Sequence, residues 1–163
     1  YNPVHEMTFS LAAGLNWKGI DFSILLQGAA RSSIYLQQDI AWDNFWGNYY
    51  EEHIGRWTPE TAATATYPRF TKAATAAHPN YYKSDYWLKD SKYLRLKNIQ
   101  LGYTIPRKLL KKFGVRSLRV YANAYNLFTW DNVKKVDPES SNNSNGQFYP
   151  QQKVINFGIN LNF

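Results

Sequence analysis

The sequence contains no cysteine, so neither a disulfide framework nor a thiolate metal site is available to it. It also contains no run of about 18 apolar residues, which excludes a transmembrane helix. The first residues lack the basic and apolar regions of a signal peptide, so a mature or internal start is expected. His5, His53 and His78 lie far apart and the glycines are isolated, so neither catalytic histidine motifs nor phosphate-binding loops occur. We therefore expect no enzymatic activity.

The net charge of +7 is spread along the chain rather than gathered in one region. The one dense basic cluster consists of Arg107, Lys108, Lys111 and Lys112. Charge runs of this kind are usually solvated, so we interpret the cluster as an exposed turn rather than a polyanion site. No nucleic acid partner is expected.

Aromatic residues make up 17% of the chain, a content typical of β-strands, binding surfaces and membrane interfaces. Five segments alternate apolar and polar residues with a period of two, which predicts strands with two unlike faces. These segments span about 7–17, 20–30, 91–105, 115–128 and 153–163. In the third segment, Leu94 and Leu96 have the opposite parity from Ile99 and Leu101. This slip predicts a bulge, or the point at which the strand leaves a bilayer.

The connections between these segments are alternately short and long. Residues 18–19 make a tight turn, and residues 106–114 are short enough for one or two helical turns closed by Gly114. Residues 31–90 and 129–152 are long. Strands of this length with alternating connections are typical of outer-membrane barrels, which have short periplasmic turns and long extracellular loops. The predicted fold is all-β, as five strands of a transmembrane antiparallel β-barrel.

Orientation follows if the long connections are extracellular. The last strand then runs inward and the C-terminus is periplasmic, while residues 1–6 come from the extracellular loop of an earlier hairpin. Five strands cannot close a barrel, so residues 1–163 are expected to be the C-terminal part of one barrel domain in a longer chain.

Two other protein classes share parts of this pattern. A soluble antiparallel sandwich, such as a carbohydrate-binding module, also alternates apolar and polar residues, and the mean hydropathy of −0.53 is compatible with it. A passive porin or an adhesin would share the barrel. Against the soluble module, the polar face carries Asn, Gln, Gly, Ser and Thr with few charges, which suits a lumen better than a soluble surface.

Several local sequences occur in a fixed order along nearly the whole chain. They are WKGIDF at 17–22, LQG at 26–28, RWTPE at 56–60, YPRF at 67–70, the segment 84–103, LRVY at 118–121, NLFTW at 126–130 and DPE at 137–139. Each motif alone is weak, but the ordered set closely resembles the C-terminal region of SusC/RagA-type TonB-dependent transporters of Gram-negative outer membranes.

The resemblance implies a 22-stranded barrel whose plug domain and TonB-contacting segment lie outside this chain. It also implies import of glycans, oligosaccharides or peptides, driven through TonB, with a SusD-like surface lipoprotein as a lid. Phe157 and Phe163 would then form the aromatic signal by which the barrel is recognised for assembly in outer-membrane lipid.

Two sets of candidate site residues follow. Aromatic side chains of the long loop could contact substrate or lid, because flat rings stack on sugars and peptide side chains, or they could pack the loop against itself. This set is Trp42, Trp46, Tyr49, Tyr50, Trp57, Tyr81, Tyr82 and Trp87. The expected lumen-facing set is Asp21, Gln27, Asn98, Gln100, Arg119, Tyr121, Asn123 and Tyr125, with Asn156 and Asn160 from the last segment.

No metal site or cofactor is expected from the residue pattern. Asp43, Glu51, Glu52 and His53 lie close in sequence, but carboxylates in an exposed loop are usually solvated. Asp131, Asp137 and Glu139 lack the spacing of an EF-hand, which leaves only a structural Ca²⁺ in the extracellular loops or the lid as an alternative.

Overall fold

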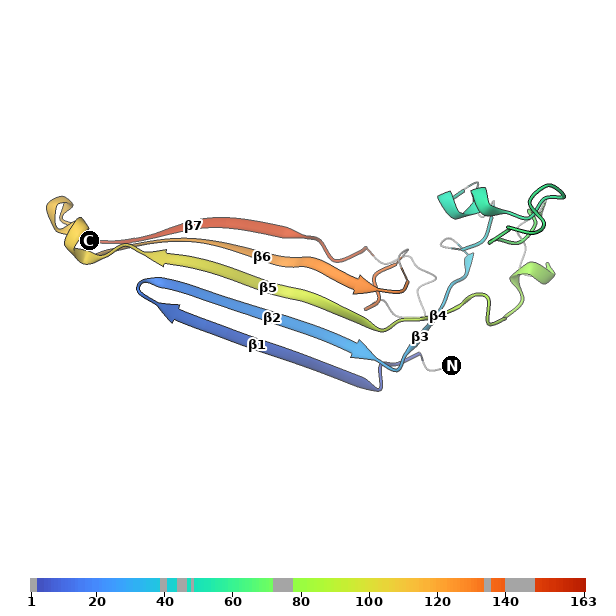
Figure 1. Cartoon of the computed structure of the whole chain (residues 1–163), viewed down its shortest axis with the longest axis horizontal. Helices are drawn as coiled ribbons and strands as arrows, with labels where there is room; N and C mark the ends of the chain where they lie inside the picture. The colour runs from blue at the N-terminus through green and yellow to red at the C-terminus, as the bar shows by residue number, and fades with distance from the viewer. Residues whose placement is uncertain are drawn as a thin grey trace.

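The computed structural model describes residues 3–38, 41–43, 47, 49–71, 78–133, 136–139 and 149–163. Its main element is an open antiparallel sheet of five strands in the order β1-β2-β5-β6-β7. These strands are β1 (Met7–Trp17), β2 (Ile20–Ala30), β5 (Tyr93–Thr104), β6 (Ser117–Asp131) and β7 (Val154–Asn162). The five predicted strands are confirmed, and they run side by side as one layer (Figure 1).

Short turns lie at one end of this sheet, which we call the turn end. Lys18 and Gly19 both have positive φ, at 47° and 89°, between the paired residues Trp17 and Ile20. Two such residues make the type I′ turn that matches strand twist. Between β5 and β6, the predicted helical turns are present as α1 (Arg107–Leu110) and η4 (Lys111–Phe113), which end at Gly114 with φ 68°.

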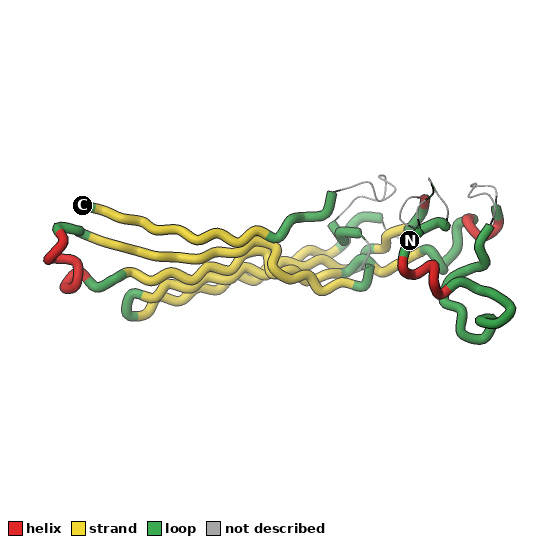
Figure 2. Tube along the Cα trace, turned by 90° about the horizontal axis from the view of Figure 1, so that it is seen from above, coloured by secondary structure: helices red, strands yellow, loops and turns green. Residues whose placement is uncertain are grey.

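The two long connections gather at the opposite end, which we call the loop end, as Figure 2 shows. The first contains η2 (Glu51–Gly55), η3 (Pro79–Tyr81) and a two-stranded ladder of β3 (Ser33–Tyr35) with β4 (Leu88–Asp90). That ladder was not predicted, because three-residue strands are too short for a visible alternation. Within residues 41–54, the described part contains η2, and residues 44–46 and 48 lie outside the described residues. None of the described helices is long and apolar enough to cross a membrane.

One face of the sheet is apolar from edge to edge. Residues directly opposite in antiparallel strands point to the same face, so the register defines rows of side chains across the sheet. One row runs Leu15, Phe22, Leu101, Ala122, Phe157, and the next runs Trp17, Ile20, Tyr103, Val120, Ile159. Many of these side chains are exposed, including Phe157 at 83%, because no described segment of the chain covers this face.

The predicted bulge is present and explains the change of parity. Leu25 pairs with Asn98 but Leu26 pairs with Leu96, so Lys97 is an extra residue in β5. On the other side, the register between β5 and β6 also shifts between Leu96 and Asn98, next to Asn126, which has φ 50°. A bulge re-aims the following side chains. Leu96 thereby returns to the apolar face opposite Leu26.

The packed core lies at the loop end rather than in the sheet. It is made of the buried residues Ile34, Leu36, Ala41, Trp42, Tyr67, Tyr81, Trp87 and Val133. Phe70 and Val136 pack against it from the side. The long loops therefore form a folded unit with its own core, and this unit sits at one end of a sheet whose two faces are open.

Candidate functional site

The residues expected to face a lumen share the second, polar face of the sheet. The register pairs Gln100 with Ser23 and Asn123, and it pairs Asn98 with Leu25 and Tyr125. The full set on this face is Asp21, Gln27, Asn98, Gln100, Arg119, Tyr121, Asn123, Tyr125, Asn156 and Asn160. A polar face of this kind offers hydrogen-bond donors and acceptors along the full length of the strands.

An ion pair crosses this face near the turn end of the sheet. Arg119 on β6 donates from Nε to Oδ1 of Asp21 on β2 at 2.9 Å, and its Nη2 donates to the other carboxylate oxygen. The intervening residue on β5 is Gly102, where a Cβ would lie 2.5 Å from both Arg119 Nη2 and Asp21 Oδ1. Because Gly102 has no side chain, two strands that are not neighbours can be joined by a bidentate pair, the stronger form of such contacts.

A second bare position lies beneath Tyr121. A Cβ at Gly158 would collide with the ring and hydroxyl of Tyr121, so the ring lies over the backbone of β7. The guanidinium of Arg119 is 4.8 Å from the centre of the same ring. Nearby, Asn156 Nδ2 donates to Asn123 Oδ1 at 3.0 Å. This part of the polar face thus holds two groups of mutually contacting side chains, Asp21 with Arg119 and Tyr121, and Asn123 with Asn156.

At the loop end of the same face, Arg95 holds the second long loop onto the sheet. The side chain of Arg95 is 2% exposed and lies 2.7 Å from Asp137 and 3.2 Å from Glu139. Its Nε also donates to Thr129 Oγ1 at 3.0 Å. Tyr93 adds a hydrogen bond from its hydroxyl to Glu139 at 2.7 Å. A buried arginine needs a compensating charge as well as hydrogen-bond acceptors, and Asp137 and Glu139 supply both, so the DPE motif is fixed at this place.

Sequence reasoning did not identify Arg95 as a site residue. The change of parity at the bulge was the available signal, because it places Arg95 on the polar face with Gln27. The pairing with Asp137 links residues 42 positions apart and could not be read from spacing. Asp137 and Glu139, considered above for Ca²⁺, therefore pair with a cation of the chain itself. No group of three or more metal-ligating side chains occurs among the described residues.

The loop aromatics divide into a buried and an exposed group. Trp42, Tyr81 and Trp87 are buried, and Trp42 stacks on Tyr81 with ring centres 4.5 Å apart. These three belong to the core of the loop unit, which agrees with the alternative that loop aromatics pack against one another. Tyr49, Tyr50, Trp57 and Tyr82 are exposed and remain candidates for contact with a ligand or lid. Trp46 lies outside the described residues.

A buried carboxylate organises this loop core. Asp43 is 1% exposed and accepts hydrogen bonds from the hydroxyls of Tyr67 and Tyr81 and from the backbone N–H of Thr71, the last at 3.0 Å. Burial, followed by the nearby Asp43 charge, raises the pKa of both tyrosines far above its usual range. Both hydroxyls therefore stay protonated. Tyr81 donates to Asp43, whereas Tyr67 lies 2.8 Å from the carbonyl of Ala41, its nearer acceptor, and 3.4 Å from Asp43. This residue was considered for a metal site, but in the structure its partners are hydroxyl and backbone donors.

His53, from the same candidate metal group, is also a core residue. Its Nδ1 accepts from the N–H of Tyr50 at 3.0 Å, so Nε2 carries the proton and faces the carbonyl of Ala41 at 3.3 Å. The ring is 4.5 Å from the ring of Tyr67. Both nitrogens are thus occupied by the backbone of the loop unit, and Glu51 and Glu52 remain exposed on η2.

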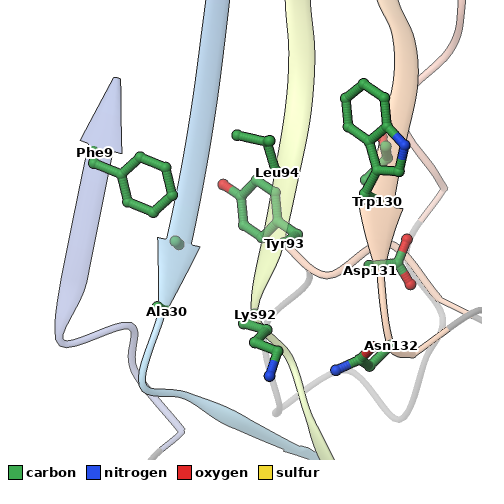
Figure 3. Close-up of a pocket in the computed structure, with 10 residues that line it drawn as sticks. Phe9, Ala30, Lys92, Tyr93, Leu94, Trp130, Asp131 and Asn132 are labelled. Carbon is green, nitrogen blue, oxygen red and sulfur yellow. The ribbon is translucent and has the colours of Figure 1, made fainter. Parts of the chain in front are cut away.

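A groove lies at the loop end of the sheet, and residues of β1, β2, β5 and β6 line it (Figure 3). Phe9 lies over the bare backbone of Gly28, and Leu94 and Trp130 continue the same row of the apolar face. Lys92 and Asn132 line the outer part of the groove. The groove combines an apolar floor with polar groups at its edge, as expected where the apolar face of the sheet ends.

The aromatic residues of the last strand lie on the apolar face. Phe157 pairs with Ala122 at the centre of the strand, and Phe163 follows directly after β7 with 76% of its surface exposed. Two further aromatic residues of the apolar face, Trp17 and Tyr103, lie in one row near the turn end, because both pair with Ile20. The proposed role of Phe157 and Phe163 in assembly stays a prediction.

Known proteins resemble this chain along nearly its whole length. It is 28% identical to the TonB-dependent receptor P26 of Formosa agariphila and 25% identical to the TonB-dependent receptor SusC of Bacteroides thetaiotaomicron, with 99% of the chain covered in each case. The chain spans only 17% and 15% of the length of these two relatives. No protein-family model matches it.

Solved structures agree with the sequence matches. The RagAB peptide importer in its open-open state matches 96% of the chain and 17% of the solved chain, with a TM-score of 0.71 and 24% identity. A structure of the RagAB peptide transporter matches 94% of the chain and 16% of the solved chain, with a TM-score of 0.68 and 26% identity. These relatives are receptors and transporters, not enzymes, as expected for this chain. Together, the sequence and structure matches show that the chain resembles the C-terminal region of SusC/RagA-type TonB-dependent receptors.

Proposed function

We propose that the full-length protein imports glycans, oligosaccharides or peptides across the outer membrane in a TonB-dependent manner, as the barrel of a SusCD-like complex. The observation that carries this proposal is the two-faced sheet, with an apolar face that is continuous from β1 to β7 and a polar face joined by the Asp21–Arg119 pair. In a barrel the apolar face contacts lipid and the polar face lines the lumen.

The edges of the sheet support barrel closure by further strands of the full protein. β1 and β7 each pair on one side only among the described residues. In hydrocarbon every unsatisfied backbone group costs several kcal/mol, so both edges need partners there. A soluble carbohydrate-binding module is disfavoured, because exposed apolar rows as wide as this one cause aggregation in water.

The alternation of short and long connections supports one orientation of the sheet in the membrane. The loop unit is extracellular and the turn end, with the C-terminus, is periplasmic. The exposed aromatics Tyr49, Tyr50, Trp57 and Tyr82 then face the space where substrate and a SusD-like lipoprotein would meet the barrel. TonB would act through a segment of the full protein outside this chain.

Uptake in cells tests this function. The gene would be deleted and complemented, and growth would be measured on a panel of oligosaccharides and peptides as sole nutrient sources. We expect loss of growth on one class of nutrient, restored by the wild-type gene only when TonB is functional. Uptake that persists without TonB would instead indicate a passive porin, and unchanged growth on every nutrient would argue for an adhesin.

A further inference from the structure

Two of the sequence motifs form the walls of one pocket in the loop unit. Arg56, Trp57, Thr58 and Pro59 make one wall, and Arg69 with Phe70 makes the other, around a cavity of about 350 Å³. Arg56 pairs with Tyr67 in a parallel bridge, and the N–H of Trp57 donates to the carbonyl of Tyr67 at 2.9 Å. The two motifs are therefore held together by their backbones, which leaves their side chains to shape the cavity.

The pocket is cationic, and none of the described residues that line it carries a carboxylate. Arg56 and Arg69 are both exposed, and neither guanidinium forms an ion pair with any described residue. Arg56 lies over the ring of Phe70, with its guanidinium 5.0 Å from the ring centre. Stacking on an aromatic ring restricts the guanidinium while leaving its N–H groups free to donate. Two like charges at one cavity repel each other until an anion lies between them.

The backbone on both sides is fixed, so the arginines are presented on a rigid frame. Thr61 Oγ1 donates to the carbonyl of Arg56 at 2.9 Å, and Asn80 Nδ2 donates to the carbonyl of Arg69 at 2.8 Å. Phe70 packs against the buried core of the loop unit. A binding group held in this way loses little conformational entropy when a ligand arrives.

We propose that this pocket binds a carboxylate group of the imported ligand. Guanidinium groups match a carboxylate with paired hydrogen bonds, and Trp57, Pro59 and Phe70 offer an apolar surface for the adjoining part of the ligand. The size of the cavity is at the small end of ligand pockets and fits one residue or one sugar ring. A cavity of this size holds a single group, whereas each partner of a stable protein interface contributes roughly 20–30 residues, which argues against the lid as the occupant.

The position of the pocket agrees with this role, and the inference rests on the proposed import function. Residues 56–70 lie in the teal and green segment that projects beyond the loop end in Figure 1, on the side opposite the two turns. With the proposed orientation, a ligand arriving from outside would meet this pocket before it reached the polar face of the sheet.

Binding to the intact complex tests the inference. The full-length receptor with its lipoprotein would be titrated by calorimetry with four probes: a pentapeptide with a free C-terminal carboxylate, the same peptide as its amide, trigalacturonate and maltotriose. We expect at least one acidic probe to bind about tenfold or more tightly than its neutral counterpart, as charge-assisted hydrogen bonds suggest. Preference within the peptide pair or within the sugar pair tells which ligand supplies the carboxylate.

Matched variants assign that preference to the pocket. The double variant Arg56→Gln with Arg69→Gln should remove the preference and leave the affinity of the neutral probes unchanged. The double variant with lysines should keep part of it, because charge remains while the paired geometry is lost. Arg107→Gln, an exposed arginine at the turn end, is the control and should change nothing.

Four results would overturn the inference. They are equal affinity for acidic and neutral probes, no binding of any probe, a preference that survives in the glutamine variant, and loss of the lipoprotein from that variant with ligand affinity unchanged. The last result would assign the pocket to the lid. The import function is judged separately by TonB-dependent growth, so it can stand when this inference fails. Heat-dependent mobility of the barrel on gels verifies that each variant is folded.

Discussion

Asp21 and Arg119 lie on strands that are not neighbours, and they meet across the sheet above Gly102. The glycine between them makes the pair possible, because any side chain on that residue would occupy the place of the guanidinium. The pair joins β2 to β6 over β5 and fixes three strands with one contact. The contact depends on the register of the three strands. The alternation of apolar and polar residues within each strand does not predict that register.

Substituting Gly102 with alanine should therefore destabilise the sheet. The added Cβ would force Arg119 and Asp21 apart, and overpacking of this kind typically costs about 1–3 kcal/mol. The midpoint of thermal unfolding of the full-length receptor, followed by its gel mobility, measures the effect. Gly14→Ala is the matched control on the same face, since a Cβ there would meet only the carbonyl of Phe22 at 3.5 Å. Equal stability of the two variants would contradict the role of Gly102.

Removing Arg95 should release the second long loop. Arg95→Ala would leave the carboxylates of Asp137 and Glu139 without their buried partner, and breaking a buried pair costs about 3–5 kcal/mol. We expect chymotrypsin to cleave near Tyr149 much faster in this variant. Lys92→Ala is the control, because its ion pair with Asp90 is exposed and such pairs contribute about 0–1 kcal/mol. Unchanged cleavage in the Arg95 variant would show that the loop is held by other contacts.

The same clamp should weaken in acid. Burial alone would raise the pKa of Asp137, but hydrogen bonds from the N–H of Glu139, from Arg95 and from the N–H of Gln151 outweigh it and lower the pKa below its usual value. A depressed pKa means that the stabilisation is present above the unfolded-state value of about 3.9 and is lost as the pH falls through the folded-state pKa.

A spin label at position 149 reports this transition. Its mobility should stay low from pH 7 down to about pH 4 and rise below that value. In an Asp137→Asn background the label should already be mobile at pH 7, with a smaller further change in acid. A label that is equally mobile at pH 7 in both backgrounds would count against the clamp.

Asp43 should stabilise the core of the loop unit although it is a buried charge. Asp43→Ala would remove the carboxylate that accepts from the hydroxyl of Tyr81 and from the N–H of Thr71, while Tyr67 would keep the Ala41 carbonyl as its acceptor. Losing the acceptor of a buried polar group costs about 1–3 kcal/mol. Hydrogen exchange at the Thr71 amide should become faster at constant pH. The exposed Asp85 offers a control, because its replacement by alanine should leave that amide protected. Equal protection in both variants would indicate that Asp43 is dispensable.

Much of the sheet could be predicted from sequence because strands of nine or more residues repeat their alternation several times. The tight turn at Lys18 and Gly19, the helical turns ending at Gly114 and the bulge near Leu96 also left local signals. Each of these features depends on residues that are close in sequence, so the local residue pattern was enough to predict it.

The loop unit could not be predicted in the same way. Its core joins Trp42, Tyr67, Tyr81 and Trp87, which are brought together by a connection without long periodic elements. Whether an aromatic side chain becomes core or surface is decided there by contacts between distant residues. Trp42 and Trp57 look alike in sequence, but one is buried and the other exposed. Buried Asp43 was likewise indistinguishable from a solvated loop carboxylate.

The central claim is that the two faces of the sheet meet lipid and water respectively, and alternate positions of β7 test it most directly. This chain has no cysteine, so single cysteines at Ile155, Asn156, Phe157, Ile159 and Asn160 of the full-length receptor can carry spin labels in lipid nanodiscs, once any cysteine elsewhere is replaced. Labels at 155, 157 and 159 should collide with oxygen dissolved in lipid, and labels at 156 and 160 with a water-soluble nickel reagent. Accessibility to the nickel reagent at all five positions, without a period of two, would contradict the account.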